Sequence, residues 1–177
     1  MLFRSAPDGY TLLYVAPSTM VSGVLLLKEA KIDPVRDFSP VLEFYRATRA
    51  LAVPATLPVG SLKELVEYGR RYPGKISYGS GGIGSSFHLE TEAFKMVSGL
   101  DMVHVPYKGT GPFTQDLVLG RVEFGIIPLQ NLLVHVAAGK TRLLAVVADR
   151  RDPLAPDRKS TRLNSSHVAL SRMPSSA

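Results

Sequence analysis

The chain has 177 residues, 45% of them apolar, which is enough for one ample core or for two small lobes joined by crossings. It contains no cysteine, which excludes a disulfide framework and thiolate chemistry, and no apolar run reaches the roughly 18 residues that a membrane span needs. A formal net charge of +6 and a pI near 9.7 would ordinarily suggest nucleic-acid binding, but the two chain ends supply most of that charge.

Both ends resemble translated sequencing-library adapters. Residues 157–167 (DRKSTRLNSSH) match an adapter translation codon for codon, residues 171–177 match its continuation, and residues 2–5 match the reverse complement. We interpret residues 1–5 and 157–177 as adapter-derived, and we expect the C-terminal stretch to be disordered. These ends carry +4 of the net charge, so only +2 remains for residues 6–156, and a nucleic-acid partner is disfavoured.

The first third of the chain predicts strands, a short helix and a loop. Residues 11–16 form an apolar run after an Asp-Gly turn and predict a strand, and a short helix is expected over 19–27. Prolines near both ends of residues 32–40 indicate a loop. Two further strands are expected over 41–45 and 49–53.

From Ser61 onward helices and strands alternate strictly. Ser61 and Glu64 have the spacing of a capping box at a helix start. Alternation with short connections predicts a parallel or mostly parallel sheet covered by helices. The expected elements are a helix from 61, a strand at 75–78, a helix at 86–98, a strand at 102–107, a helix at 113–119 with Pro112 as its first residue, a strand at 122–127, a helix from 129 to 139 and a strand at 143–148.

Ligands of such sheets bind beyond the carboxyl ends of the strands, which makes the turns at 79–86, 108–112 and 128–130 candidates. The first turn fits the dinucleotide pattern G-x-G-x-x-G, yet the acidic residue that should end the next strand is absent, because Asp101 lies before that strand. A P-loop is also disfavoured, since no lysine precedes the serines.

The surviving interpretation of the first turn is an anion cradle. Ser85 or Ser86 would cap the helix and offer a hydroxyl, and the glycines would allow close approach of the ligand to the backbone. A plain turn that only links strand to helix remains the alternative.

Catalytic and metal sites have little support. His88, His104 and His135 lie on separate elements without metal-ligand spacing, and no nucleophile elbow occurs. His88 is expected either to cap its helix or to contact a ligand, and His104 to pack between strand and helix. His135 is expected near a helix C-terminus. The sequence therefore predicts no catalytic residue, no metal and no cofactor.

Several motifs in fixed order resemble one family. They are APDGYTLL at 6–13, SLKEL at 61–65, PGKISY at 73–78, the run 82–89, DMVHVPYKG at 101–109 and GKTRLLAV at 139–146. This set covers nearly all of residues 6–156. It resembles the Bug-type extracytoplasmic solute receptors, the substrate-binding proteins of tripartite tricarboxylate transporters.

The resemblance implies an α/β fold like that of type II periplasmic binding proteins, with two lobes, hinge crossings and an incomplete first lobe. It implies a receptor, not an enzyme, that captures a small di- or tricarboxylate or a related organic acid in the periplasm. The partners it implies are that carboxylate and the permease subunits in the membrane, without insertion of the receptor itself.

By this resemblance, residues 6–53 are a first-lobe fragment, 54–145 the second lobe, and 146–156 a return to the first lobe. The signal peptide, the proline- and glycine-rich first loop and the portion after Pro156 are expected to be missing. Because that loop supplies the other half of the carboxylate clamp, we expect the chain alone to bind weakly or not at all.

The family holds its ligand through main-chain N–H groups, hydroxyls and water. Carried over to this sequence, the expected ligand-binding residues are Ser80, Gly81, Gly82, Gly84, Ser85, Ser86, His88, Tyr107, Gly109, Thr110 and Pro128.

Many members have an acidic residue where this chain has Ile127-Pro128, which disfavours an amino-acid ligand. Two alternatives stay open: an α/β hydrolase-like enzyme using Ser85 and His88, and a receptor recruited to signalling.

Overall fold

The computed structural model describes residues 33–43, 47–147 and 161–163, together with residues 10, 12, 13, 15, 20 and 22. The chain divides into two compact units, residues 1–41 and 42–177.

In the first unit the Asp33 side chain accepts the N–H groups of Val35 and Arg36, which forms the turn expected at 32–40. Met20 and Ser22 are helical; the rest of the helix expected at 19–27, and most of the strand expected at 11–16, lie outside the described residues.

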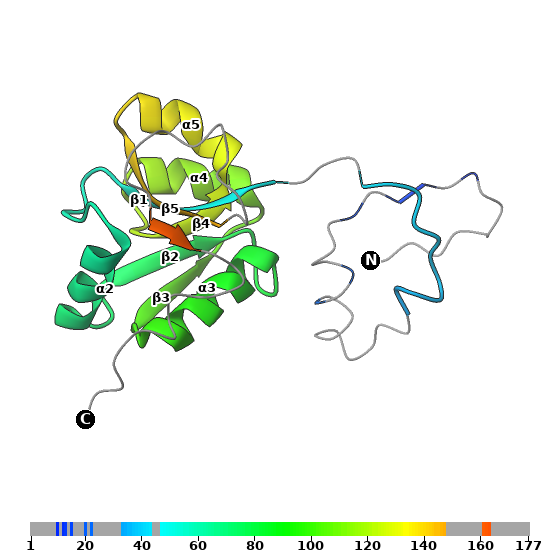
Figure 1. Ribbon diagram of the computed structural model, residues 1–177, viewed down its shortest axis with the longest axis horizontal. Coiled ribbons are helices and arrows are strands. Elements are labelled where there is room, and N and C mark those ends of the chain that lie inside the picture. Colours follow the sequence, from blue (N-terminus) through cyan, green and yellow to red (C-terminus); the bar gives the residue numbers. More distant parts are fainter. Residues whose placement is uncertain are drawn as a thin grey trace. The chain divides into compact units, whose positions relative to one another are not determined.

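The second unit contains the alternating helices and strands (Figure 1). Its elements are β1 (Arg49–Pro54), α2 (Leu62–Arg71), β2 (Ile76–Ser80), α3 (Ser86–Ser98), β3 (Met102–Pro106), α4 (Thr110–Val118), β4 (Gly125–Pro128), α5 (Leu129–Ala137), β5 (Thr141–Val147) and β6 (Thr161–Leu163).

Three predicted elements need correction. The strand expected at 122–127 begins only at Gly125, after a single bridge at Phe124. The helix expected from 113 begins at Thr110, so Pro112 is its third residue; Gly109, with a φ of +104°, provides the abrupt turn that lets it start early. The strand expected at 41–45 is wrong for residues 41–43, which belong to no strand, and residues 44 and 45 lie outside the description.

The strands form two sheets, one in the order β4-β1-β5-β6 and one of β2 and β3. The predicted parallel direction holds for all strands except β1. β2 and β3 pair in parallel, and a parallel bridge from Tyr78 to Phe124 joins β2 to the segment that enters β4. β1 lies between β4 and β5 and is antiparallel to both. The carboxyl ends of β2, β3 and β4 therefore share one edge with the beginning of β1 (Figure 1).

The boundary expected after Val53 would cut through β1. Residues 50–53 are almost completely buried in the sheet core, which is why β1 groups with the unit that begins at Leu42. β5 likewise continues to Val147, past the return expected at 146. Thr161–Leu163 pair in parallel with residues 145–147, so these three residues form a strand where we expected disorder; the rest of 157–177 lies outside the description.

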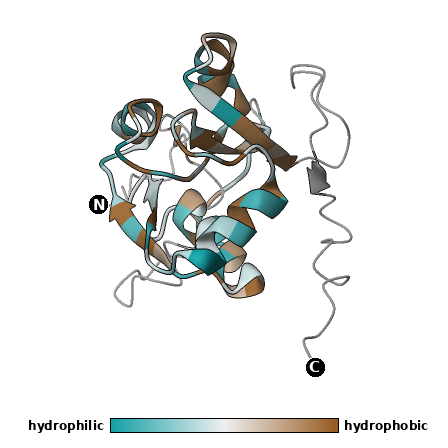
Figure 2. Ribbon diagram, turned by 90° about the vertical axis from the view of Figure 1, so that its left-hand side faces the viewer, coloured by the Kyte–Doolittle hydropathy of each residue, from teal (hydrophilic) through white to brown (hydrophobic). Residues whose placement is uncertain are grey.

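Apolar clusters pack on both faces of the sheet. One involves α2 and α3 and includes Leu65, Tyr78 and Phe124; the other involves α4 and α5 and includes Phe113 and Leu132. The strands are accordingly mostly apolar, whereas polar residues gather on the helices (Figure 2). Within the described ranges, no helix is long and apolar enough to cross a membrane.

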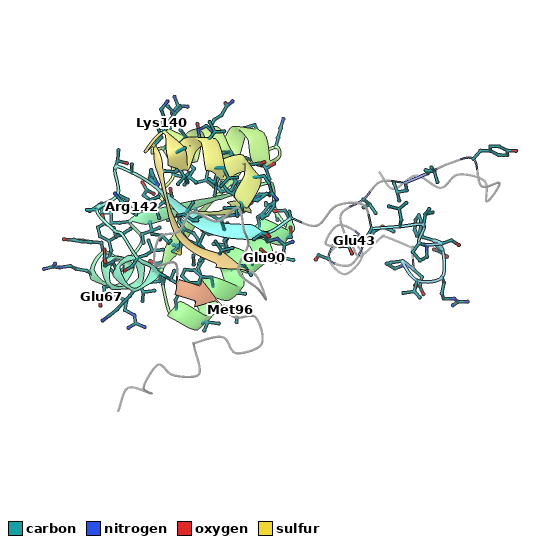
Figure 3. All side chains as sticks on the ribbon, turned by 45° about the horizontal axis from the view of Figure 1, so that its top comes forward. Glu43, Glu67, Glu90, Met96, Lys140 and Arg142 are labelled. Atoms are coloured by element: carbon teal, nitrogen blue, oxygen red, sulfur yellow. The ribbon has the colours of Figure 1, made fainter. Side chains whose placement is uncertain are left out.

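The start of α2 confirms the predicted cap in slightly altered form. Ser61 Oγ accepts the Glu64 N–H at 3.2 Å, and the Glu64 carboxylate accepts the N–H of Gly60 at 2.7 Å. The bond from Gly60, and secondarily a bond that the Ser61 hydroxyl donates to the same carboxylate at 2.9 Å, lowers the pKa of Glu64. This helix N-terminus is therefore occupied by a carboxylate of the chain itself. Arg142 (Figure 3) connects β5 to the segment that precedes α2, because its guanidinium donates to the carbonyls of Leu57 and Val59.

Candidate functional site

Three helices begin at the same edge of the sheet. α3 follows β2, α4 follows β3 and α5 follows β4, and the parallel strands bring their carboxyl ends together. Neither α4 nor α5 has a side-chain cap. In these three helices, six first-turn amides have no hydrogen-bond acceptor among the described residues: those of Ser86, Phe87, Thr110, Gly111, Gln130 and Asn131. Such N–H groups, at the positive ends of helix dipoles, favour an anion.

The loop between β2 and α3 is bonded internally. Ser80 is fully buried, and its hydroxyl donates to the carbonyl of Gly82 and accepts the N–H of the same residue. The Ser85 N–H donates to the Gly82 carbonyl at 3.2 Å, and Ser85 Oγ caps α3 by accepting the His88 N–H. The predicted cap at Ser85 is confirmed.

The glycines of this loop are required for different reasons. Gly82 and Gly84 have φ of +129° and +77°, which side chains rarely tolerate. Gly79 has no such conformation; a Cβ there would lie 2.1 Å from Cδ2 of the buried Phe113 ring. A side chain at Gly81 would meet only ordinary contacts. In the G-x-G-x-x-G pattern, Gly79 is therefore required by packing and Gly84 by the shape of the loop.

The second turn, between β3 and α4, is tied to the first. The Tyr107 N–H donates to the Ser80 carbonyl, and the Gly109 N–H donates to the Gly81 carbonyl. The Tyr107 hydroxyl donates to Asp116 at 2.8 Å, and burial together with this bond raises its pKa to about 12. The amides of Tyr107 and Gly109 therefore support the loop and are not available to a ligand.

His88 and His104 lie together under the loop. Their ring centroids are 4.2 Å apart, and His104 also stacks on Tyr78 at 4.8 Å. His88 Nδ1 accepts the Gly84 N–H at 3.2 Å, and His104 Nε2 lies 2.7 Å from the hydroxyl of Ser80. The packing expected for His104 is found. His135 lies in the last turn of α5, as expected, away from this cluster.

Sequence analysis missed Arg49 at the same edge. Its guanidinium pairs with Glu90 at 2.8 Å and lies over the ring of Phe87 at 5.9 Å, which ties β1 to α3. Burial raises the pKa of Glu90, and Arg49 partly opposes that rise. A lone arginine at the start of an otherwise apolar strand was the signal available.

The predicted ligand-binding residues thus lie at one edge of the sheet, but they differ in burial and in hydrogen bonding. Ser86 and Thr110 contribute unpaired amides, and Pro128 leads into the uncapped start of α5. Ser80 is buried, so it can act only through the loop. No cluster of metal-ligating side chains occurs among the described residues.

Comparison with known proteins identifies the architecture. The model of the tripartite tricarboxylate transporter family receptor matches residues 1–171, a range that includes most of the adapter-like C-terminal stretch. The chain belongs to this receptor family. It is 33% identical to a Cupriavidus necator UPF0065 protein over 156 residues, 88% of this chain and 47% of that protein. It is 31% identical to Protein BugT of Bordetella pertussis over 154 residues, 86% of this chain and 47% of that protein.

Solved structures agree with this family. A periplasmic transporter has 36% identity and a TM-score of 0.83, over 92% of this chain and 54% of that one. R. palustris Rpa4515, solved with adipate, has 37% identity and a TM-score of 0.68, over 77% of this chain and 45% of that one. The chain therefore has the fold of a periplasmic binding protein and spans about half the length of its relatives.

Proposed function

We propose that this chain provides one jaw of a periplasmic receptor that binds a small carboxylate and delivers it to the permease subunits of a tripartite tricarboxylate transporter. The observation that carries the proposal is the meeting of three helix N-termini with unpaired amides at one edge of the sheet. Membership of the receptor family and the adipate in R. palustris Rpa4515 support the choice of anion.

The chemistry of this edge suits a ligand that has a carboxylate but no ammonium group. Backbone amides at helix starts bind a carboxylate through partial charges. This chain has Ile127 and Pro128 where many members of the family have an acidic residue that could pair with an ammonium group, and Ile127 is fully buried. We therefore propose a plain organic acid, and not an amino acid, as ligand.

The geometry gives no support to the hydrolase alternative. Ser85 Oγ accepts the main-chain N–H of His88, and His88 Nδ1 accepts the N–H of Gly84. A serine nucleophile needs a hydrogen bond from its hydroxyl to the ring of its base, and that bond is not formed. We do not propose an enzyme.

The test is a titration of the ¹⁵N-labelled chain with adipate, followed by the shifts of individual amide signals. Of weak binding and no binding, the two outcomes expected for a chain that lacks half of the clamp, the three helix starts favour weak binding. We therefore expect saturable shifts of the Ser86, Thr110 and Gln130 amides with a Kd of about 1 mM, because one jaw gains only part of the free energy of closure. The Lys63 amide, at the start of α2, is the internal control, since the Glu64 carboxylate lies at that helix end, bonded to Gly60 and Ser61, and its negative charge opposes a second anion there.

Neutral adipamide is the matched ligand control and should leave these signals in place. Equal shifts with adipamide, or adipate shifts confined to other elements, would contradict a carboxylate site at this edge. Binding of glutamate more tightly than adipate would contradict the proposed ligand class.

A further inference from the structure

Two histidines contact the glycine loop through different nitrogen atoms. His104 Nε2 lies 2.7 Å from Ser80 Oγ, which is bonded to both the N–H and the carbonyl of Gly82. His88 Nδ1 accepts the N–H of Gly84 at 3.2 Å. Each ring therefore restrains one of the two loop glycines that have positive φ.

His104 is anchored in the sheet, and His88 in the first turn of α3. Tyr78 and His104 are direct partners in the parallel register of β2 and β3, so strand pairing itself places one ring on the other. Tyr78 is fully buried, its hydroxyl donates to Glu92, and the Lys95 ammonium lies 5.5 Å from its ring centroid. His88 stacks on His104 in turn.

The hydrogen bonds also indicate the protonation state and tautomer of the imidazole rings. Because His88 Nδ1 accepts an N–H, the proton of this imidazole is on Nε2. Burial, and secondarily the neighbouring His88, lowers the pKa of His104, which favours the neutral ring. Two neutral rings can remain stacked at 4.2 Å without charge repulsion.

Building on the proposed function, we propose that His88 and His104 are positioning residues for carboxylate binding. They hold Gly84 and Gly82 in the loop shape that presents the first amides of α3, and they act through these glycines without touching the carboxylate. The Ser85 N–H, bonded to the Gly82 carbonyl, carries this restraint from the loop into the start of α3.

Conservative variants separate positioning from direct contact. His88→Asn keeps an acceptor near the place of Nδ1 but lacks the outer Nε2–H, and His104→Gln keeps a polar group near the place of Nε2. We expect His88→Leu and His104→Leu to weaken adipate binding about fivefold to tenfold, the value of one hydrogen bond. We expect the Asn and Gln variants to bind within about twofold of the unchanged chain.

His135→Leu is the control, because this histidine lies on α5 outside the cluster, and it should leave adipate binding unchanged. Long-range ¹⁵N spectra of the histidine rings should show His88 protonated at Nε2 only. The Gly82 and Gly84 amide signals should move in both leucine variants and return in the conservative ones, whether or not ligand is present. Far-UV circular dichroism establishes that each variant is folded.

Three results would overturn the inference. They are a His88→Asn variant as weak as His88→Leu, which would indicate direct contact; leucine variants that bind adipate normally; and glycine signals that do not respond to the leucine substitutions. Failure of adipate to bind the unchanged chain would instead refute the proposed function, and the glycine signals and the ring tautomer would still decide the positioning of the loop.

Discussion

Replacing Gly79 by alanine should destabilise the fold although only one methyl group is added. The new Cβ would lie 2.1 Å and 2.3 Å from two ring atoms of Phe113, where ordinary contacts exceed 3.4 Å. The ring is fully buried and also covers Gly125, whose own Cβ would lie 2.3 Å from it. It can only lift away from two neighbouring strands, so we expect a loss of about 3 kcal/mol, the upper end of the usual cost of overpacking.

Urea unfolding followed by circular dichroism measures this loss. Phe113→Leu alone should cost about 2 kcal/mol through lost burial. Because the smaller side chain relieves the clash, the Gly79→Ala/Phe113→Leu double variant should be more stable than additivity predicts, by about 1–2 kcal/mol. Gly111→Ala is the matched control, since nothing lies within 4 Å of its Cβ position, and it should be neutral or slightly stabilising. Additive losses, or a loss no larger than that of the control, would refute a packing requirement at Gly79.

Three further predictions concern the same edge. Gly84→Ala, which forces a side chain onto a φ of +77°, should cost about 1–2 kcal/mol in urea unfolding, and a neutral result would contradict the loop shape. Arg49→Met should cost less than about 1 kcal/mol, since the pair is partly exposed, and should raise the pKa of Glu90 further in a carboxyl NMR titration; an unchanged pKa would argue against the ion pair. The lowered pKa of His104 means that the unfolded chain binds protons more readily, so stability should be constant above about pH 6.5 and fall as the pH decreases through the folded pKa. His104→Gln should flatten that fall, and an equal slope in the variant would assign it to other groups.

Sequence reasoning succeeded where the signals are local. α3 has the predicted bounds because Ser85 caps its first turn and Gly99, with a φ of +67°, ends it. The position of the candidate anion-binding turn followed from alternating elements and from glycines within a few residues of one another. Such features depend only on residues close together in the sequence, so they can be predicted without knowledge of the tertiary contacts.

Tertiary structure decided what each residue of that turn does. The strand direction of β1, and with it the place of Arg49, depends on pairing with β4 and β5, some 75 to 100 residues away in sequence. The Phe113 ring leaves no room for a side chain at Gly79, and a hydrogen bond with His104 holds the Ser80 hydroxyl in place. The sequence by itself determined that a glycine turn meets a helix start here. Only the fold decided which glycines serve packing and which serve loop shape, because a steric limit or a hydrogen bond between distant residues exists only after the strands have paired.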